Sequence, residues 1–413
     1  MGNDLNNIIK SSDLDQKFLN NISEIDETRS IFACFECGMC TSSCPVAEFF
    51  LFDPHQMTRL TAIGASTQIL NDQSLRFCLT CRICQEFCPQ DVDFIEFIKK
   101  ARTLSIEKGI EIDEPHDGIL STITEIQAKN QSGFKIPSNI IPEGFQLSKT
   151  GKVAYFFGCL PILDVIFDYL NLNLIGIAKN AVSILNKVFG KPPVIIENIK
   201  CCGHDALWKG RFTTFKELAE HNVKEINKLG IETIITTCAE CYRTLKIDYP
   251  KYVKNVKFEV IHLSEFIANA IKKNEIKFSK TSNINVTYHD PCRLGRHLKV
   301  YEPPREILNN MENYGVNFNE MDRNTETSPC CGVSCFLNCN DLSRVLQIDR
   351  LTEAEKIADI MLTTCPKCLI HYNCMLQDKK EKKSDDINIK ISDLTNLIAQ
   401  FMDLDDLEKN RMK

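Results

Sequence analysis

The side chains with the clearest potential for chemistry are cysteines, and one pattern of five recurs in the second part of the chain. Each copy has a single cysteine, then a Cys-Cys-Gly triplet, then a Cys-x-x-Cys pair. The two sets are Cys159, Cys201, Cys202, Cys238 and Cys241, and Cys292, Cys330, Cys331, Cys365 and Cys368. A repeat of about 130 residues is too long for one unit of a solenoid. The pattern therefore predicts two duplicated domains, each with a thiol-based site.

Five thiols per copy are one more than an ordinary site needs, because four thiolates complete a cubane [4Fe–4S] cluster or a tetrahedral zinc site. Adjacent cysteines such as Cys201 and Cys202 suit a single tetrahedral ion poorly, since their side chains diverge. It is easier for one of them to bridge two irons. A zinc site and a set of buried thiols without a ligand both stay open as alternatives. The second of these leaves the recurrence of the same five positions unexplained.

A second cysteine pattern lies near the N-terminus, where two runs follow the spacing C-x2-C-x2-C-x3-C-P. This is the spacing of bacterial ferredoxins, in which three thiolates of one run and the fourth of the other hold each [4Fe–4S] cubane. The expected sets are Cys34, Cys37, Cys40 with Cys88, and Cys78, Cys81, Cys84 with Cys44. A pair of structural zinc sites is the alternative, but such sites commonly combine two Cys pairs separated by a longer spacer.

The composition limits the class of protein. A chain of 413 residues has room for two or three domains, and its net charge of −6 gives no electrostatic support for nucleic-acid binding. Twenty-one cysteines, an odd number with tight spacing, indicate metal and not a disulfide framework in a reducing cytoplasm. We expect no secretory signal at the N-terminus and no myristoylation, which Asn6 disfavours. We also expect no membrane span, because Asp164 and Asp168 interrupt the most apolar stretch, 153–178.

The N-terminal cysteine runs lie among segments that read as helices. Residues 13–30 suit a helix with a polar face, and Asp53-Pro54 is typical of an N-cap followed by proline at the first helical position. An apolar stripe from Phe94 to Leu104 predicts a further helix that ends at Gly109. These segments predict a helical ferredoxin-like domain over residues 1–130, followed by a linker over 131–152.

The duplicated part alternates strand-like and helix-like segments, which predicts a parallel sheet in each copy. In the first copy the expected strands cover 153–157, 194–197 and 233–237, and the expected helices cover 175–188, 216–229 and 264–271. The predicted domains are 153–275 and 284–413. Because functional groups in such sheets lie at the carboxyl ends of strands, four of the cysteines are expected there. These are Cys159, Cys238, Cys292 and Cys365. The charged run near Lys380 is interpreted as a solvated loop.

On these motifs the chain resembles a known family. The segments CCGHDALW, CAECYRTLKIDYP, YHDPCRLGRH and CPKCLIHY resemble the CCG-domain proteins. Together with CGMCTSSCPV and CLTCRICQEFCP, they make the whole chain similar to the D subunit of heterodisulfide reductase, a fusion of the ferredoxin-like C subunit with the catalytic B subunit. The implied fold is α+β and multidomain, with an all-α two-cluster domain before two α/β CCG domains.

The resemblance implies a function in disulfide reduction, typical of methanogenesis. Each five-cysteine set would hold a noncubane [4Fe–4S] cluster, with the disulfide of coenzyme M and coenzyme B, or a similar one, between them. Electrons would come from a flavin- and ferredoxin-type donor subunit or a membrane cytochrome b subunit, through the two cubane clusters. No G-x-G-x-x-G or Walker loop is present, so neither flavin nor nicotinamide is expected in this chain. The expected location is cytoplasmic or peripheral to the inner face of the membrane.

Two other functions stay open: an iron–sulfur subunit of a flavin-linked glycolate or lactate oxidase, and an electron-transfer module without a substrate. For the leading hypothesis, cationic side chains near the motifs are candidates for binding an anionic thiol substrate. They are Arg243, Arg293, Arg296 and Lys367, with Lys246, His297 and His371 as further candidates. A surface charge is the plainer interpretation of any single one.

Further residues near the motifs are not explained by the repeat. His204 and His289 adjoin motif cysteines and are expected to hydrogen-bond cluster sulfurs. Cys335, Cys339 and Cys374 lie outside the pattern, and we interpret them as unligated thiols near the second five-cysteine set. The stretch 160–178 is longer and more apolar than the family pattern, so it is expected to shape a substrate pocket or contact a partner.

Overall fold

The computed structural model describes residues 14–49, 52–110, 112–133, 135, 140–141, 148–378 and 387–402. The charged run near Lys380 lies outside these residues. The chain forms two compact units, which we describe separately. Unit 1 contains Met1–Ile119, Asp205–Phe212 and Ser334–Leu342, and unit 2 contains Leu120–His204, Thr213–Val333 and Ser343–Lys413.

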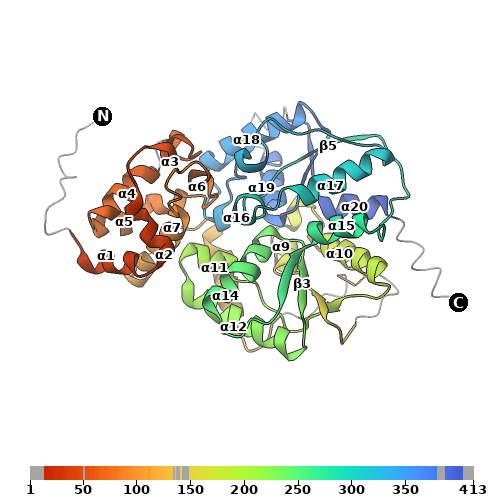
Figure 1. Ribbon diagram of the computed structural model, residues 1–413, viewed down its shortest axis with the longest axis horizontal. Helices are drawn as coiled ribbons and strands as arrows, with labels where there is room; N and C mark the ends of the chain where they lie inside the picture. The colour runs from red at the N-terminus through yellow and green to blue at the C-terminus, as the bar shows by residue number, and fades with distance from the viewer. Residues whose placement is uncertain are drawn as a thin grey trace. The chain divides into compact units, whose positions relative to one another are not determined.

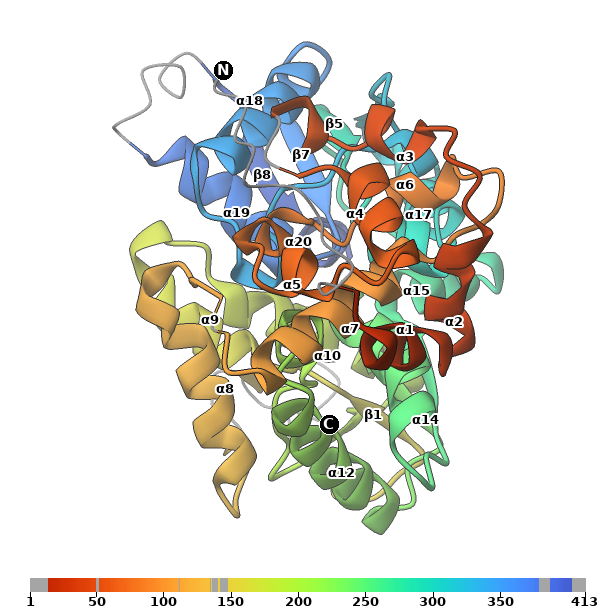
Figure 2. The same cartoon turned by 90° about the vertical axis from the view of Figure 1, so that its left-hand side faces the viewer.

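Unit 1 is helical, as the sequence predicts. Its main helices are α1 (Gln16–Ser23), α2 (Asp26–Arg29), α3 (Met39–Ser42), α4 (Pro54–Ala62), α5 (Ser66–Leu70), α6 (Ile83–Glu86) and α7 (Phe94–Glu107). Figure 2 shows α4, α5 and α7 side by side. Asp53 caps α4 by accepting hydrogen bonds from the backbone of His55 and Gln56. The expected helix over 13–30 is instead two helices, because the chain leaves helical geometry at Ile25.

Two segments from far along the sequence complete unit 1. Each begins just after a Cys-Cys-Gly triplet: Asp205–Phe212 follows Gly203, and Ser334–Leu342 follows Gly332. The first segment carries most of α11 (His204–Lys209), including Trp208, which is fully buried. The helix α8 (Ile119–Lys129) belongs almost entirely to unit 2. These compact units are built from separate segments and do not coincide with the predicted domains 1–130, 153–275 and 284–413 and the linker 131–152. That division along the sequence stays a prediction.

Unit 2 contains two parallel four-stranded sheets of the same topology (Figure 1). The first has the order β2-β1-β3-β4 and the second β6-β5-β7-β8. The strands are β1 (Val153–Tyr155), β2 (Val194–Ile195), β3 (Thr233–Thr236), β4 (Glu259–His262), β5 (Ile284–Tyr288), β6 (Val316–Phe318), β7 (Ile360–Thr363) and β8 (Lys390–Asp393). The predicted duplication and the predicted parallel sheets are confirmed.

The helices of unit 2 alternate with these strands. In the first repeat they include α9 (Leu160–Ile166), α10 (Leu174–Phe189), α12 (Phe212–Lys228), α13 (Ala239–Arg243), α14 (Tyr249–Tyr252) and α15 (Leu263–Lys272). In the second repeat they include α16 (Gly295–Leu298), α17 (Glu302–Met311), α18 (Asp341–Glu355), α19 (Pro366–Leu376) and α20 (Leu394–Phe401). No helix in the described part of the chain combines the length and apolar character needed to cross a membrane.

The two repeats exchange helix contacts. The helix α10 of the first repeat packs against α20 of the second, and α17 of the second packs against α15 of the first (Figure 1). Asn180 Nδ2 donates to Asn396 Oδ1 at 2.9 Å in the first contact, and Lys272 Nζ lies 2.7 Å from Glu306 in the second. The end of the apolar stretch 160–178 forms the start of α10, where Leu174, Ile175 and Ile177 are buried. A role of the rest of this stretch in a substrate pocket or a partner contact stays a prediction.

Candidate metal centres

The glycine of each Cys-Cys-Gly triplet fixes the loop on which the cysteines lie. Gly203 and Gly332 have φ values of +82° and +85°, a region that side chains disfavour. A Cβ on Gly203 would also lie 3.0 Å from the ring of Phe215, and one on Gly332 would lie 3.2 Å from Ser343. In this conformation each glycine N–H points to the first sulfur of its triplet, at 3.4 Å from Cys201 Sγ and 3.5 Å from Cys330 Sγ. The triplet is therefore a loop shaped around sulfur.

Cys159 and Cys238 follow the carboxyl ends of β1 and β3, as predicted, and the other three thiols of the first repeat gather beside them. Hydrogen bonds between thiols link them in the order Cys159, Cys201, Cys202, Cys241 and Cys238. The bond with Cys201 and the burial of the site raise the pKa of Cys159 and of Cys202. A hydrogen bond from Cys241 lowers the pKa of Cys238. Buried, mutually contacting thiols of this kind are a donor set that a thiophilic metal group fits.

The second repeat repeats this arrangement around Cys330, Cys331, Cys368 and Cys365. Cys368 Sγ lies 3.3 Å from Cys331 Sγ, and hydrogen bonds from Cys330 and Cys368 lower the pKa of Cys331. Cys292 follows the carboxyl end of β5 and is half-buried.

The two five-cysteine sets meet each other within unit 2. A hydrogen bond joins the thiols of Cys238 and Cys365, lowering the pKa of Cys238 and raising that of Cys365. Beside them, Lys367 of the second repeat forms an ion pair with Glu240 of the first, and both side chains are buried. No layer of protein separates the two Cys-x-x-Cys pairs.

A second polar contact crosses between the repeats next to this point. Arg293 Nε donates to His204 Nε2 at 2.9 Å, and Arg293 Nη1 lies 2.7 Å from His297 Nε2. His204 Nδ1 in turn lies 3.3 Å from Glu240 Oε2. The buried side chains from Lys367 to His297 thus form one connected polar array along the contact between the repeats.

The four predicted substrate-binding cations have different surroundings. Lys367 and Arg293 belong to the array between the repeats. Arg243 forms an ion pair with the fully buried Asp248, and Arg296 donates to the backbone carbonyls of Ser328 and Glu326, just before the second triplet. Lys367 and Arg293 therefore lie at the contact between the two five-cysteine sets, whereas Arg243 pairs within its own helical segment and Arg296 holds the chain before the second triplet.

The histidines near the motifs also divide. Both ring nitrogens of His204 have partners, Glu240 and Arg293, and His371 Nδ1 lies 2.9 Å from the Cys331 carbonyl. In contrast, His289 is buried, and its Nε2 has no hydrogen-bond partner among the described residues. Burial lowers the pKa of His289 to about 3, so the ring is neutral. An unpaired ring nitrogen near Cys331 fits a hydrogen bond to a sulfur-rich group there.

In unit 1 the two ferredoxin-type runs interleave. Burial, with smaller contributions from the nearby Cys81 and Cys78, raises the pKa of Cys44 to about 12, which places Cys44 beside the second run. Burial also raises the pKa of Cys78 to about 11. The neighbours of Cys44 agree with the expected crosswise pairing, which stays a prediction.

The remaining cysteines lie in two different places. Cys335 and Cys339, interpreted from sequence as thiols near the second five-cysteine set, belong instead to unit 1, and Cys335 contributes to the electrostatic environment of Cys78. Cys374 is half-buried, and its Sγ lies 3.9 Å from the hydroxyl of Tyr169.

Several residues that hold the first triplet were not found from sequence. The side chain of Asn222 donates to the carbonyls of Lys200 and Cys201, and the Tyr249 hydroxyl donates to the Cys202 carbonyl. From α8, Gln127 accepts a hydrogen bond from the Cys201 backbone at 3.1 Å. Their only signal in the sequence is a polar residue within an apolar helical pattern, which many surface positions share.

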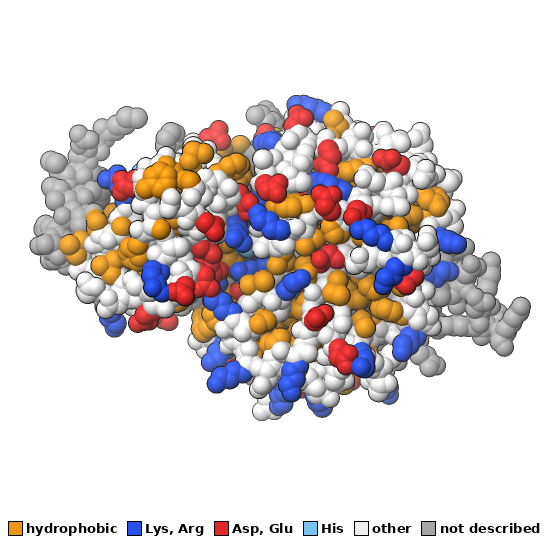
Figure 3. All heavy atoms as spheres, in the orientation of Figure 1, with side chains coloured by type: hydrophobic (Ala, Val, Ile, Leu, Met, Phe, Trp, Pro, Cys, Tyr) orange, Lys and Arg blue, Asp and Glu red, His pale blue; other side chains and the backbone are white. Residues whose placement is uncertain are grey.

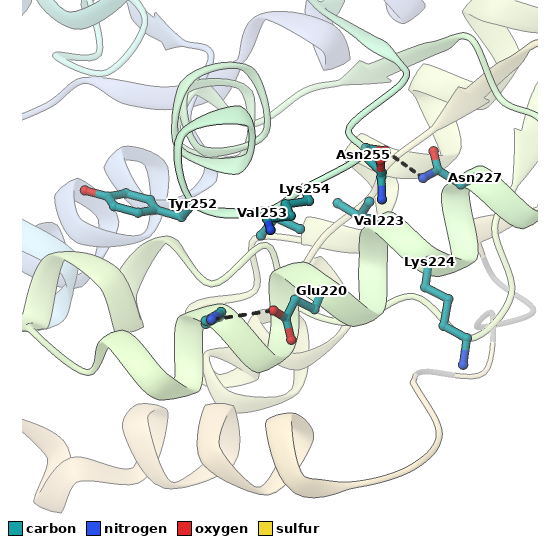
Figure 4. A pocket seen from close by; sticks show the side chains of 9 residues that line it. Glu220, Val223, Lys224, Asn227, Tyr252, Val253, Lys254 and Asn255 are labelled. Atoms are coloured by element: carbon teal, nitrogen blue, oxygen red, sulfur yellow. Dashed lines mark hydrogen bonds and ion pairs between the residues drawn. The ribbon is translucent and has the colours of Figure 1, made fainter.

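A separate hollow of about 500 Å³ lies along α12, away from the cysteine motifs (Figure 4). Its walls include Lys216, Lys224 and Lys254 with Glu220, and Asn227 Nδ2 donates to the Asn255 carbonyl at 2.8 Å. Figure 4 shows side chains that line the hollow, among them Glu220, Lys224 and Asn227, and no motif cysteine is among the lining residues. We assign it no part in the chemistry.

Comparison with known families agrees with the motif assignments. The family model of the cysteine-rich CCG domain matches residues 153–246 and 286–373, and the 4Fe-4S dicluster domain matches residues 33–93. These two families account for both duplicated repeats and both N-terminal runs, and they support iron–sulfur clusters in this chain.

Individual relatives cover most of the chain. The D subunit of the dihydromethanophenazine:CoB–CoM heterodisulfide reductase of Methanosarcina mazei is 30% identical over 335 residues, 79% of this chain and 78% of that protein. The B subunit of the fumarate reductase (CoM/CoB) of Methanothermobacter marburgensis is 29% identical over 379 residues, which are 87% of this chain and 70% of that protein. A hypothetical protein from Helicobacter pylori has a similar fold, with a TM-score of 0.54 at 12% identity over 94% of this chain and 75% of its own.

Proposed function

Because the chain belongs to the family of the heterodisulfide reductase D subunit, we propose that it is the iron–sulfur catalytic subunit of a disulfide reductase. The substrate class is a disulfide of two small anionic thiols, such as the mixed disulfide of coenzyme M and coenzyme B. The observation that carries this proposal is the direct contact of Cys238 with Cys365. The two sulfurs of a disulfide lie only about 2 Å apart, so sites that act on both must adjoin.

Four iron–sulfur groups fit the cysteines. Two cubane [4Fe–4S] clusters would be held by the crosswise sets of unit 1, and two noncubane [4Fe–4S] clusters by the five-cysteine sets of unit 2. When bound, such groups supply electrons one at a time, and reduction of a disulfide to two thiols takes two electrons and two protons. The burial of both Cys-x-x-Cys pairs excludes bulk water from the shared site.

The side chains of this chain would orient the substrate. Lys367 lies close enough to Cys159 and Cys238 to interact electrostatically with both thiols, and it opposes part of the increase in the pKa of Cys159. A buried ammonium favours an anionic ligand at that point, and its ion pair with Glu240 offsets part of this charge. Arg293, between His204 and His297, offers a second cation on the same contact.

Electrons would reach the shared site from a partner subunit through unit 1. Of the motif cysteines, Cys37 is exposed, and the large apolar side chains of Phe35 and Met39, two residues away on either side, are exposed as well, as is Phe87 next to Cys88. Figure 3 shows hydrophobic side chains gathered on the part of unit 1 that carries α3. An exposed apolar surface around a redox group favours protein docking. The partner class is a flavin- and ferredoxin-type donor or a membrane cytochrome b subunit.

Electron paramagnetic resonance (EPR) of anaerobically purified protein tests the proposal. We expect about sixteen to eighteen irons per chain, little zinc, and an EPR signal that appears on oxidation in the presence of coenzyme M or coenzyme B thiol. Replacing Cys37 or Cys81 by Ala should reduce electron transfer into the protein and leave the thiol-dependent signal. Stoichiometric zinc with about eight irons would contradict the noncubane assignment. Full iron without any thiol-dependent signal would favour the electron-transfer subunit of a glycolate or lactate oxidase.

A further inference from the structure

One buried arginine of unit 1 lies at the meeting point of three segments. Arg102, on α7, is fully buried, and its guanidinium donates to four backbone carbonyls. Nη2 bonds the carbonyls of Leu75 and Cys78 at 2.7 and 2.8 Å and that of Arg76 at 3.4 Å, and Nη1 bonds the carbonyl of Trp208 at 2.8 Å. The first three carbonyls form the loop that leads into the second cysteine run. The fourth belongs to the segment that follows the first triplet.

The segment that follows the second triplet reaches the same loop. Ser334 Oγ donates to the Cys78 carbonyl at 2.8 Å, and Asn338 Nδ2 donates to the Arg76 carbonyl at 3.1 Å. Cys335 lies near enough to Cys78 to influence its pKa. The Cys78 carbonyl therefore accepts one hydrogen bond from Arg102 and one from the chain that leaves the second triplet.

The segment after the first triplet is held as firmly. Gly210 has a φ of +91°, and a Cβ on it would lie 2.5 Å from the backbone carbonyl carbon of Arg102. Lys209 and Arg211, on either side, pair with Glu114 at 2.6 and 2.9 Å. Only glycine allows the segment to approach α7 this closely. Both chain segments that follow the triplets thus pack against α7 or the loop that leads into the second cysteine run.

We propose that Arg102 is a positioning residue that joins the second ferredoxin-type run to the segments leaving both triplets and raises the reduction potential of the iron–sulfur group on that run. This makes the group on Cys78, Cys81, Cys84 and Cys44 the point at which electrons leave unit 1. The inference rests on the proposed electron-transfer function.

The physical reason is the fixed charge of the guanidinium. Adding an electron to an iron–sulfur group adds negative charge, which a buried cation nearby stabilises, so the potential rises. The same cation opposes the burial-driven increase in the pKa of Cys78. A group at the higher potential of the two accepts electrons from the exposed first run and holds them beside the segments that lead to the triplets.

An EPR-monitored redox titration of the loaded full chain tests the charge. Arg102→Gln removes the charge, and we expect the midpoint potential of one cubane signal to fall while that of the other stays unchanged. Arg102→Lys keeps the charge but cannot bond all of these carbonyls, so its potential should stay closer to that of the wild type. Unchanged potentials in both variants, or equal shifts of both cubane signals, would overturn the proposal.

Fluorescence tests the positioning, because Trp208 is the only tryptophan of the chain and is fully buried. Gly210→Ala should displace its segment, shift the emission to longer wavelength and increase quenching by acrylamide. Arg102→Lys should give the same change to a smaller extent. The matched control is Gly109→Ala, which has a φ of +77° but no neighbour within 4 Å of the added Cβ. It should leave the emission unchanged.

The two measurements remain informative if one variant does not fold. If Arg102→Gln does not retain iron, the Trp208 emission of Arg102→Lys and Gly210→Ala still tests the positioning role. Identical emission in Gly210→Ala, Gly109→Ala and the wild type would overturn the proposal. Neither measurement includes a disulfide or a thiol. A protein that fails the thiol-dependent test but shows the selective potential shift would contradict the proposed function and leave the role of Arg102 intact.

Discussion

The two repeats of unit 2 have the same framework but carry different charges where they meet. Each has a parallel sheet of the same strand order, a triplet glycine in the same left-handed conformation, and a final helix packed on the other repeat. At equivalent positions within the Cys-x-x-Cys pairs, the first repeat has Glu240 and the second has Lys367. In a symmetric dimer of one repeat, like charges would meet at this buried point.

The helix caps have diverged in the same way. The last helix of the first repeat is capped by His262, and that of the second by Asp393, and both caps are buried at the carboxyl end of a strand. The difference shows that duplication kept the architecture needed to hold sulfur, whereas the contact became specific for one arrangement of two unlike halves. An unsymmetrical site of this kind is suited to a substrate with two different ends.

The largest effect should come from removing one ligand in either repeat. Cys202→Ala and Cys331→Ala change equivalent triplet cysteines, and each should lose about four irons and reduce disulfide reduction by at least about 100-fold. The reason is that, in the proposed function, both sets act on one substrate. Iron analysis and a disulfide reduction assay check this.

Cys374→Ala is the control, because this thiol lies outside both sets and its nearest polar contact is Tyr169. Substantial activity in either ligand variant would show that the repeats act independently.

The charge difference can be tested by removing one partner of the buried ion pair. Lys367→Met leaves Glu240 without its cation, and we expect a loss of about 3–5 kcal/mol in the free energy of unfolding. The double variant Glu240→Gln with Lys367→Met leaves no unpaired charge and should lose less. Anaerobic urea unfolding followed by circular dichroism measures both. Equal stability of the single variant and the wild type would mean that the contact does not depend on this pair.

The two caps should respond to pH in opposite directions. Burial raises the pKa of Asp393 to about 7, so the folded protein binds this proton more tightly than the unfolded chain does. Its contribution to stability therefore falls as pH rises from about 4 to about 7. Burial lowers the pKa of His262, so its contribution falls as pH decreases below about 6.5.

Replacement of each cap by Asn should remove its own pH dependence. Relative to the wild type, Asp393→Asn should gain on the order of 1 kcal/mol between pH 5 and pH 8, while His262→Asn should gain towards pH 5. Unfolding midpoints at the two pH values measure the difference. The same sign of change in both variants would refute the contrast between the caps.

The smallest effect is expected at the exposed edge of the helix exchange. Lys272, on α15, pairs with Glu306 on α17 at 2.7 Å, and its side chain is 60% exposed. Lys272→Ala should change the unfolding free energy by less than about 1 kcal/mol, because solvent screens such pairs. Thermal unfolding is a sufficient measurement. A larger loss would mean that the exchange depends on surface charge and not on the apolar faces of its helices.

The sequence predicted those features that depend on residues close together in the chain, such as strand ends and helix caps. Parallel strands bring their carboxyl ends to one edge, so cysteines that follow strands, such as Cys238 and Cys365, had to gather there. The N-cap of Asp53 and the helix ending before Gly109 were predicted for similar local reasons. Cluster ligation, in contrast, stays a prediction.

Contacts between distant segments could not be predicted from the same patterns. The amphipathic pattern of α10 indicates that one face is buried but does not identify α20 as its partner. The ion pair of Glu240 with Lys367 depends on one charged residue in each Cys-x-x-Cys pair, at a position that the motif itself leaves unspecified. Arg102 interrupts an apolar helical stripe as many surface arginines do, and only the fold shows that it is buried among carbonyls.

The exchange of helices also sets an order of assembly during synthesis. The apolar face of α10 has to wait for α20, which leaves the ribosome more than about 200 residues later, and unit 1 lacks part of its wall until Ser334–Leu342 has emerged. The N-terminal runs therefore cannot reach their final packing before residues 334–342 have been synthesised. Until then the unfinished chain would expose thiols and a large apolar surface to chaperones and oxidants.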